Sequence, residues 1–199
     1  MYKKCIKRVI DFTLSVIGMP VFLLSFIIVA PIIFISDRGP VFYNANRIGK
    51  KGKTFKMYKY RSMNVNAPDI RLNDGSTYNS ENDPRVTKVG RILRKTSIDE
   101  LPQILNVFWG DMSLIGPRPN LPTVPYDELD EAHKHRLEVR PGITGYNQAY
   151  FRNSVSAEQR TKNDIYYVDN LSFFLDVKIL VQTVITVLRR DNIYSSAKK

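Results

Sequence analysis

Two adjacent carboxylates, Asp99 and Glu100, are the residues of this sequence whose surroundings most favour chemistry. They lie in Ser97-Ile98-Asp99-Glu100, the pattern of a capping box, in which Ser97 caps a helix and Glu100 reaches back to it. Capping is the simpler interpretation of these four residues alone, because the helix dipole also favours acids in a first turn. Pro102, however, lacks an amide hydrogen that a longer first turn would need. Four cations also precede the pair: Lys88, Arg91, Arg94 and Lys95.

Cations and a helix N-terminus keep a carboxylate ionised at neutral pH, which suits a nucleophile or a magnesium ligand. Adjacent residues on a helix point about 100° apart, so the two acids cannot face each other across a sugar ring as a glycosidase pair does. They can act on one phosphorus centre. One carboxylate would attack phosphorus to form an acyl phosphate, and the other would handle a proton on the acceptor.

An anionic phosphate repels an attacking carboxylate, so this chemistry needs nearby positive charge. Magnesium supplies it by bridging phosphate oxygens, and arginine supplies it through its forked donors. Two of the candidate arginines, Arg118 and Arg140, lie beside prolines that restrict their backbones, and such position-holding favours catalysis. The full set of candidate arginines is Arg94, Arg118, Arg140 and Arg152.

The composition fits a basic protein with one globular domain and an appendage. The chain has 199 residues and a formal net charge of +11, which suggests a polyanionic partner such as nucleic acid, anionic lipid or a phosphate-rich small molecule. Cys5 is the only cysteine, which excludes an intramolecular disulfide and a cysteine-based zinc site. His133 and His135 lie in a charge-rich stretch and are interpreted as surface residues.

The N-terminal segment from Phe12 to Ile35 contains no charged residue and is long enough to enter a membrane. Basic residues flank both of its ends, and such residues prefer the cytoplasmic side. A re-entrant helix that leaves on the side it entered satisfies both ends, so it is favoured over a straight span. Pro20 and Pro31 can bend the helix, and Ser15 and Ser25 could return hydrogen bonds to the carbonyls that the prolines free.

The rest of the chain predicts an α/β fold that is mainly helical with a small sheet. Short strands are expected at residues 41–43 and 54–61, a polar loop at 64–84, and rigid loops at 116–119 and 140–145. Helices are expected at 86–95, 97–109, 126–138, 156–170 and 173–190. The last helix is apolar on most of its circumference, so it is either buried or lies on the membrane. We therefore divide the chain into a membrane-inserted helix, residues 1–36, and a compact catalytic domain, residues 37–199.

Ordered motifs along nearly the whole chain resemble a known family. They are Lys7-Arg8-Val9-Ile10-Asp11, Gly39-Pro40-Val41-Phe42, Arg47-Ile48-Gly49, the run 55–63 that includes Lys59, Ser97-Ile98-Asp99-Glu100-Leu101-Pro102-Gln103, the run 110–119, the run 140–145, Asp164-Ile165-Tyr166-Tyr167-Val168 and Asp176-Val177-Lys178. The pattern resembles that of a small monotopic phosphoglycosyl transferase of the bacterial sugar transferase family.

The resemblance implies transfer of a sugar 1-phosphate from a UDP-sugar to a polyprenyl phosphate, usually undecaprenyl phosphate, with release of UMP. It implies that Asp99 is the nucleophile and a magnesium ligand, and that Glu100 assists the acceptor phosphate. It implies phosphate- or substrate-binding roles for Lys59, Arg94, Arg118, Arg140 and Arg152, with Gln148 as a weaker candidate. It also implies a compact α/β unit on the cytoplasmic face of the bacterial inner membrane, with a re-entrant helix, amphipathic interfacial helices and contacts to membrane lipids.

The chain departs from the family pattern at two places. The family breaks its membrane helix at a Ser-Pro pair, but Leu24-Ser25 stands at that point, with the prolines on either side of it. The sequence after Gly145 commonly reads Trp-Ala-Gln, but here it reads Tyr146-Asn147-Gln148. Asn147 adds hydrogen-bond donors near the expected nucleotide-sugar pocket and could alter sugar preference.

Two other functions fit parts of the sequence. A membrane-tethered module could bind nucleic acid or anionic lipid through its basic surface, although the interleaved aromatic and basic pattern of a single-strand binder is missing. A membrane-bound phosphohydrolase could use the same acidic pair with water. The transferase is preferred, without a nucleic-acid partner. Resemblance to the minimal members of the family favours acetamido deoxysugars as the transferred sugars.

Overall fold

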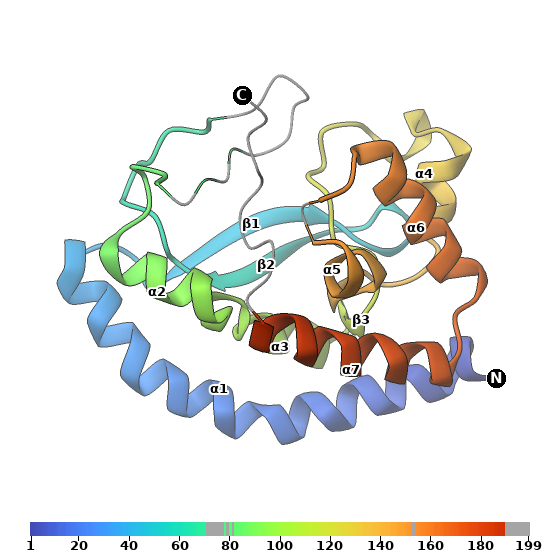
Figure 1. Ribbon diagram of the computed structural model, residues 1–199, viewed down its shortest axis with the longest axis horizontal. Helices are drawn as coiled ribbons and strands as arrows, with labels where there is room; N and C mark the ends of the chain where they lie inside the picture. The colour runs from blue at the N-terminus through green and yellow to red at the C-terminus, as the bar shows by residue number, and fades with distance from the viewer. Residues whose placement is uncertain (71–77, 79, 81, 153, 190–199) are drawn as a thin grey trace.

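The computed structural model describes residues 1–70, 78, 80, 82–152 and 154–189. The described residues form a mainly helical α/β fold with two small sheets and one long helix along one side (Figure 1). The helices are α1 (Lys7–Asp37), α2 (Lys88–Thr96), α3 (Gln103–Trp109), α4 (Glu131–Arg136), α5 (Tyr146–Tyr150), α6 (Ala157–Asp169) and α7 (Phe173–Arg189). The strands are β1 (Phe42–Ile48), β2 (Thr54–Tyr60), β3 (Ser113–Ile115) and β4 (Gly142–Thr144). Part of the loop predicted at 64–84 lies outside the described residues, as does the last residue of the helix predicted at 173–190.

The first sheet is an antiparallel hairpin of β1 and β2, whose pairing runs from Phe42 opposite Tyr60 to Ile48 opposite Thr54. The first strand extends further than predicted, because Asn44 to Ile48 continue to pair with β2 beyond the predicted end at residue 43. The second sheet is a parallel pair of β3 and β4. These strands contain three residues each and adjoin glycine and proline, so alternation could not reveal them.

Helix α1 is the only helix among the described residues that is long and apolar enough to cross a membrane. Its buried residues, Asp11, Ser15, Phe22, Val29 and Ile33, face the rest of the protein. Most of its other apolar side chains are exposed, and Ile35 has 77% of its surface accessible. One side of α1 therefore packs against the domain, and the other is apolar and uncovered by the described residues.

The course of α1 is continuous through both prolines, and the helix bends in its middle so that its two ends rise on the same side (Figure 1). Ser25 Oγ donates to the Phe22 carbonyl oxygen at 2.7 Å and also pairs with Tyr60 Oη at 2.9 Å. A proline at position 20 or 31 frees the carbonyl four residues earlier, at Val16 or Ile27. The expectation that Ser15 and Ser25 would satisfy freed carbonyls is therefore wrong, since each donates to the carbonyl three residues before it.

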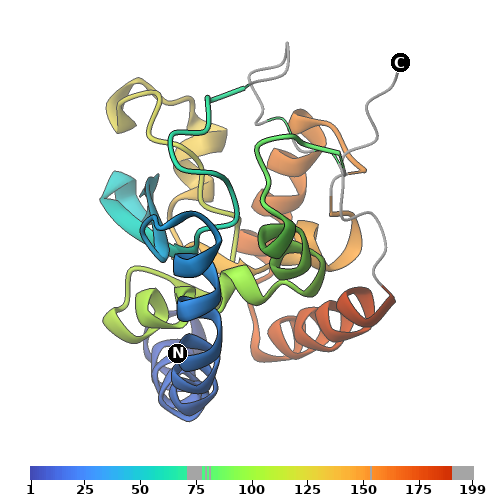
Figure 2. The ribbon, with the colours of Figure 1, turned by 90° about the vertical axis from the view of Figure 1, so that its left-hand side faces the viewer.

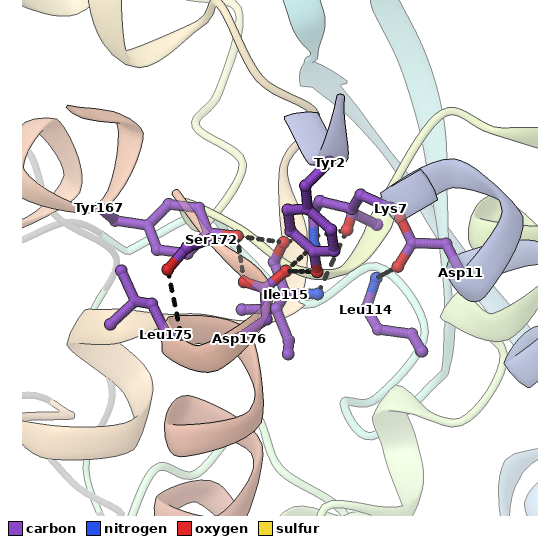
Figure 3. Close-up of polar contacts among 10 residues, drawn as sticks. Tyr2, Lys7, Asp11, Leu114, Ile115, Tyr167, Ser172, Leu175 and Asp176 are labelled. Carbon is purple, nitrogen blue, oxygen red and sulfur yellow. Dashed lines mark hydrogen bonds and ion pairs between the residues drawn. The ribbon is translucent and has the colours of Figure 1, made fainter. Parts of the chain in front are cut away.

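The N-terminal end of α1 is bound to α7 by a buried polar network (Figure 3). Asp176 of α7 accepts hydrogen bonds from Tyr2 Oη at 2.5 Å, Lys7 Nζ at 2.7 Å and Tyr167 Oη at 2.7 Å. Beside it, Asp11 Oδ1 accepts the Leu114 amide at 3.0 Å. These contacts join α1, β3, α6 and α7 into one unit.

Among the described residues, the apolar core divides into clusters that each join helices and strands. One cluster joins α1 to β2 and α2 through Phe22, Ile33, Tyr60 and Leu93. A second joins β3 to α5, α6 and α7, and a third lies between β2 and α3. Figure 2 shows α1 and α7 along the same side of the molecule.

Candidate active site

The acidic pair lies in a single 3₁₀ turn, Ile98–Glu100, between α2 and α3. Ser97 has a left-handed backbone, with φ 58°, and it ends α2. Its side chain makes no capping hydrogen bond. The helix expected to begin at Ser97 begins instead at Gln103, after Pro102. The capping-box interpretation is therefore wrong here, which removes the simplest structural explanation for two adjacent acids.

Lys59 forms an ion pair with Glu100. It comes from β2, and its Nζ lies 2.5 Å from Glu100 Oε1. Its strand is held by Asn106 of α3, whose side chain accepts the Tyr58 amide at 2.9 Å and donates to the Lys56 carbonyl at 2.8 Å. Asn106 is fully buried and was not singled out in the sequence. A buried Asn in an apolar helix is the only signal that could have indicated it.

Three arginines from separate segments complete the positive surroundings of the pair. The charge of Arg94, from α2, acts on Asp99, and Arg94 Nε donates to Ser62 Oγ at 2.9 Å. The charge of Arg118 acts on both acids, and that of Arg152 acts on Glu100. The structure therefore places four of the predicted basic residues around the acidic pair.

The two acids have opposite pKa shifts. Burial raises the pKa of Asp99 to about 6, although the charge of Lys59 opposes this rise. Burial would also raise the pKa of Glu100, but the charges of Lys59 and Arg118 hold that pKa below its ordinary value. Such a split is common at sites where two acids take different roles. Both acids are mostly ionised at neutral pH.

The Arg118 loop is held against the loop that contains β4. Gly116 donates its amide to the Thr144 carbonyl at 2.9 Å, and Gly142 donates its amide to the Pro117 carbonyl at 3.0 Å. A Cβ at Gly116 would lie 2.4 Å from the Arg140 carbonyl oxygen, so only glycine permits this approach. The two predicted rigid loops thus support one another.

The remaining two predicted residues have different surroundings. Arg140 Nε donates to the Gly110 carbonyl at 2.7 Å, and its charge acts on Lys50. Its described contacts do not bring it to the acidic pair. Gln148 lies on α5, and both polar atoms of its amide are buried without a hydrogen-bond partner. Such a group is costly unless a ligand or water satisfies it.

The described residues contain no group of three or more histidine, cysteine or acidic side chains that could hold a metal. Magnesium does not require one, because it commonly binds one or two carboxylates together with substrate phosphates. Glu100 is already paired with Lys59. Asp99 is therefore the side chain here that fits a magnesium ion best.

Comparison with known proteins gives consistent results. Over 191 residues the chain is 41% identical to the galactosyl transferase CpsE of Streptococcus agalactiae serotype III (strain NEM316), covering 92% of this chain and 42% of that protein. It is 42% identical over 189 residues to EpsL of Bacillus subtilis (strain 168), named an uncharacterized sugar transferase, covering 94% and 90%.

A third relative is the UDP-N-acetylgalactosamine-undecaprenyl-phosphate N-acetylgalactosaminephosphotransferase of Aeromonas hydrophila. It is 40% identical over 189 residues, which cover 92% of this chain and 44% of that protein. The chain thus spans less than half of two of these relatives and nine tenths of EpsL. The family model for bacterial sugar transferases matches residues 2–190, so the chain belongs to the bacterial sugar transferase family and is a transferase.

Proposed function

We propose that this enzyme transfers a sugar 1-phosphate from a UDP-sugar to undecaprenyl phosphate, releases UMP and starts the assembly of a surface glycan. The observation that supports the proposal most strongly is the acidic pair, Asp99 and Glu100, surrounded by Lys59 and three arginines. The name of the Aeromonas relative describes the same class of reaction. An acidic pair in so basic a setting suits a substrate that carries a diphosphate.

In the first step, an Asp99 carboxylate oxygen attacks the phosphorus atom that carries the sugar. The bond from this phosphorus to the bridging oxygen of the diphosphate breaks, and UMP leaves with its electron pair. The product is an acyl phosphate that links Asp99 to the sugar phosphate. Arg94 and Arg118 would stabilise the charge that develops on the phosphate oxygens, and Gln148 could donate to the donor substrate.

In the second step, an oxygen of undecaprenyl phosphate attacks the same phosphorus and displaces the Asp99 carboxylate. The product is the lipid diphosphate sugar. Glu100 is held ionised by Lys59, so it can accept the proton when the acceptor arrives as a monoanion. Arg152 would help to bind the acceptor phosphate. When bound at Asp99, magnesium would neutralise phosphate charge and so reduce the repulsion between the nucleophile and its target.

The acceptor lipid requires access from a membrane, and α1 and α7 offer an apolar surface for it. Exposed side chains on the two helices include Ile27 at 68%, Phe174 at 84% and Leu188 at 77% of their surface, and Trp109 of α3 is exposed at 69%. Exposed tryptophan is common at membrane interfaces. We propose that α1 is re-entrant, that α7 lies in the interface, and that the acidic pair faces the cytoplasm of the bacterial inner membrane.

The proposal is tested by measuring UMP release from a panel of UDP-hexoses, UDP-N-acetylhexosamines and UDP-acetamido deoxysugars, with undecaprenyl phosphate and Mg²⁺. With UDP-sugar alone, Glu100→Gln should accumulate an adduct of sugar-phosphate mass on Asp99, detected by mass spectrometry of peptides. Asp99→Asn should abolish both the adduct and turnover. Near-normal turnover by Asp99→Asn would exclude Asp99 as the nucleophile.

The same assay distinguishes the alternatives. A phosphohydrolase would release free sugar phosphate without needing the lipid. A binding module would release no UMP from any donor, and its association with nucleic acid or anionic vesicles would fall steeply with salt.

A further inference from the structure

Buried side chains of α4, α5 and α6 form a network of hydrogen bonds. Its first member is Asn147 of α5, which is 5% exposed. Asn147 Nδ2 donates to Asp164 Oδ1 at 2.7 Å and to the Arg160 carbonyl at 2.9 Å, and its Oδ1 accepts from Asn163 Nδ2 at 2.8 Å. Both donor hydrogens of this amide and one of the two lone pairs of its oxygen are thus used in hydrogen bonds that fix α5 to α6.

The network continues from Asp164 to the backbone of Arg118. The second carboxylate oxygen of Asp164 accepts Arg136 Nε at 2.5 Å, and both side chains are buried. Arg136 Nη2 then donates to the Arg118 carbonyl oxygen. A chain of charge-assisted hydrogen bonds therefore runs from α5 through α6 and α4 to the loop that presents Arg118.

The other branch of the network reaches Arg152 through the end of α5. The Asn147 carbonyl accepts the Arg152 amide at 2.7 Å and the Phe151 amide at 2.9 Å. Arg152 has a left-handed backbone, with φ 47°, which is unfavourable for a residue other than glycine unless contacts hold it. Fixing α5 therefore fixes the backbone conformation of Arg152.

We propose that Asn147, Asp164 and Arg136 form a positioning network that sets the locations of Arg118 and Arg152 at the acidic pair. The inference deepens the proposed function and rests on it, because the two arginines would bind substrate phosphates. Asn147 is then a positioning residue, which acts on the reaction through the two arginines without touching substrate.

A role for Asn147 that is limited to filling space predicts a different order of effects for the variants at this position. A buried ion pair contributes little stability over apolar residues of similar size, so stability alone gives weak reason to keep one. If Asn147 only filled space, the isosteric change Asn147→Asp would be milder than Asn147→Ala. If its donors matter, Asn147→Asp is the more damaging change, because it removes both donors and places a second carboxylate 2.7 Å from Asp164.

His135 offers a matched control. Its Nε2 contacts Asp169 Oδ1 at 2.7 Å and so joins the same two helices, α4 and α6, at their exposed surface. His135→Gln disturbs that contact but none of the hydrogen bonds of the network. Each variant would be prepared as the full chain in phospholipid nanodiscs.

The first measurement is amide hydrogen exchange, which needs no substrate. We expect the Gly116 and Arg152 amides to exchange about ten-fold faster in Asn147→Asp and a few-fold faster in Asn147→Ala, because local opening becomes easier. They should be unchanged in His135→Gln. Equal protection in wild type and Asn147→Asp would overturn the inference.

The second measurement is the steady-state rate of UMP release over the UDP-sugar panel. We expect Asn147→Asp to raise the KM for the donor about ten-fold and Asn147→Ala a few-fold, whereas loss of folded protein would lower only the apparent kcat. In an Arg118→Ala, Arg152→Ala background, Asn147→Asp should change KM less than two-fold. An unchanged KM in an active Asn147→Asp enzyme would overturn the inference. A wild type that releases no UMP would refute the proposed function, while hydrogen exchange would still decide the network.

Discussion

Replacement of Asp176 by alanine should strongly destabilise the protein, because this buried carboxylate joins α1 to α7 (Figure 3). Asp176 is 4% exposed and accepts hydrogen bonds from Tyr2, Lys7 and Tyr167. Its ion pair with Lys7 is largely buried, with side chains 12% and 6% exposed. Asp176→Ala would leave the Lys7 ammonium without its counter-charge and both hydroxyls without this acceptor.

The contacts allow the size of the effect to be estimated. Removing one partner of a buried ion pair costs about 3–5 kcal/mol. The Tyr167 hydroxyl can turn to the Ile115 carbonyl at 3.0 Å, so the two hydroxyls together add only about 1 kcal/mol. A loss of about 4–6 kcal/mol is a large part of the stability of a typical domain. For a chain of this size it corresponds to a fall in Tm on the order of 10 °C or more.

The assay is thermal unfolding of the full chain in one detergent, with Asp176→Ala, Lys7→Met, the double variant and Lys162→Gln compared. Lys7→Met should cost less, because Asp176 keeps two tyrosine donors, and the double variant should be more stable than the sum of the single changes predicts. Lys162 and Glu158 form an exposed pair, with side chains 64% and 77% accessible, so Lys162→Gln should leave Tm nearly unchanged. A shift for Asp176→Ala no larger than that control would refute the reasoning.

Three further outcomes are expected. Lys59→Met should slow UMP release by about 100-fold at saturating donor, whereas Lys59→Arg should retain most activity because it keeps the charge. Gly90→Ala should lower both Tm and activity, because the added Cβ would lie 1.9 Å from the Ser62 carbonyl oxygen. Gly18→Ala is the control and should be tolerated in both assays, because its Cβ would meet only the flexible Ile104 side chain at 3.3 Å. Hydrogen bonding to Asp169 raises the pKa of His135. The stability that this contact adds is therefore complete below about pH 6.5, and it is lost as pH rises through the folded-state pKa of His135. The difference in Tm between wild type and His135→Gln should therefore be larger at pH 5.5 than at pH 8.5.

The family resemblance predicted Lys59, Arg94, Arg118 and Arg152 at the site, and the structure places their charges around the acidic pair. Lys59 and Arg118 belong to the motifs that carry the resemblance. Their roles in catalysis remain predictions. The long apolar helix was predictable from its length and lack of charge. The parallel pairing of β3 and β4 was not, because its strands are too short for periodicity and lie beside glycine and proline residues.

Arg140 shows that membership of a sequence motif does not determine what a side chain contacts. It was expected at the acidic pair, but its side chain turns to the Gly110 carbonyl at the end of α3. Asn147 shows the converse. Its amide was expected near the nucleotide sugar, but the structure buries it against α6. Long-range pairings such as Asp164 with Arg136 leave no local pattern in one sequence.

The contacts of α1 argue that this helix is part of the catalytic fold and more than an anchor. Its middle reaches β2 through the Ser25 hydroxyl and Tyr60, and Tyr60 is the neighbour of Lys59. Its last residue, Asp37, pairs with Arg61, directly after the same strand. Because α1 also supplies three of the five buried residues of a core cluster with β2 and α2, any displacement of α1 would act on the strand that carries Lys59. The packing that holds the acidic pair in place therefore crosses the division predicted between residues 36 and 37.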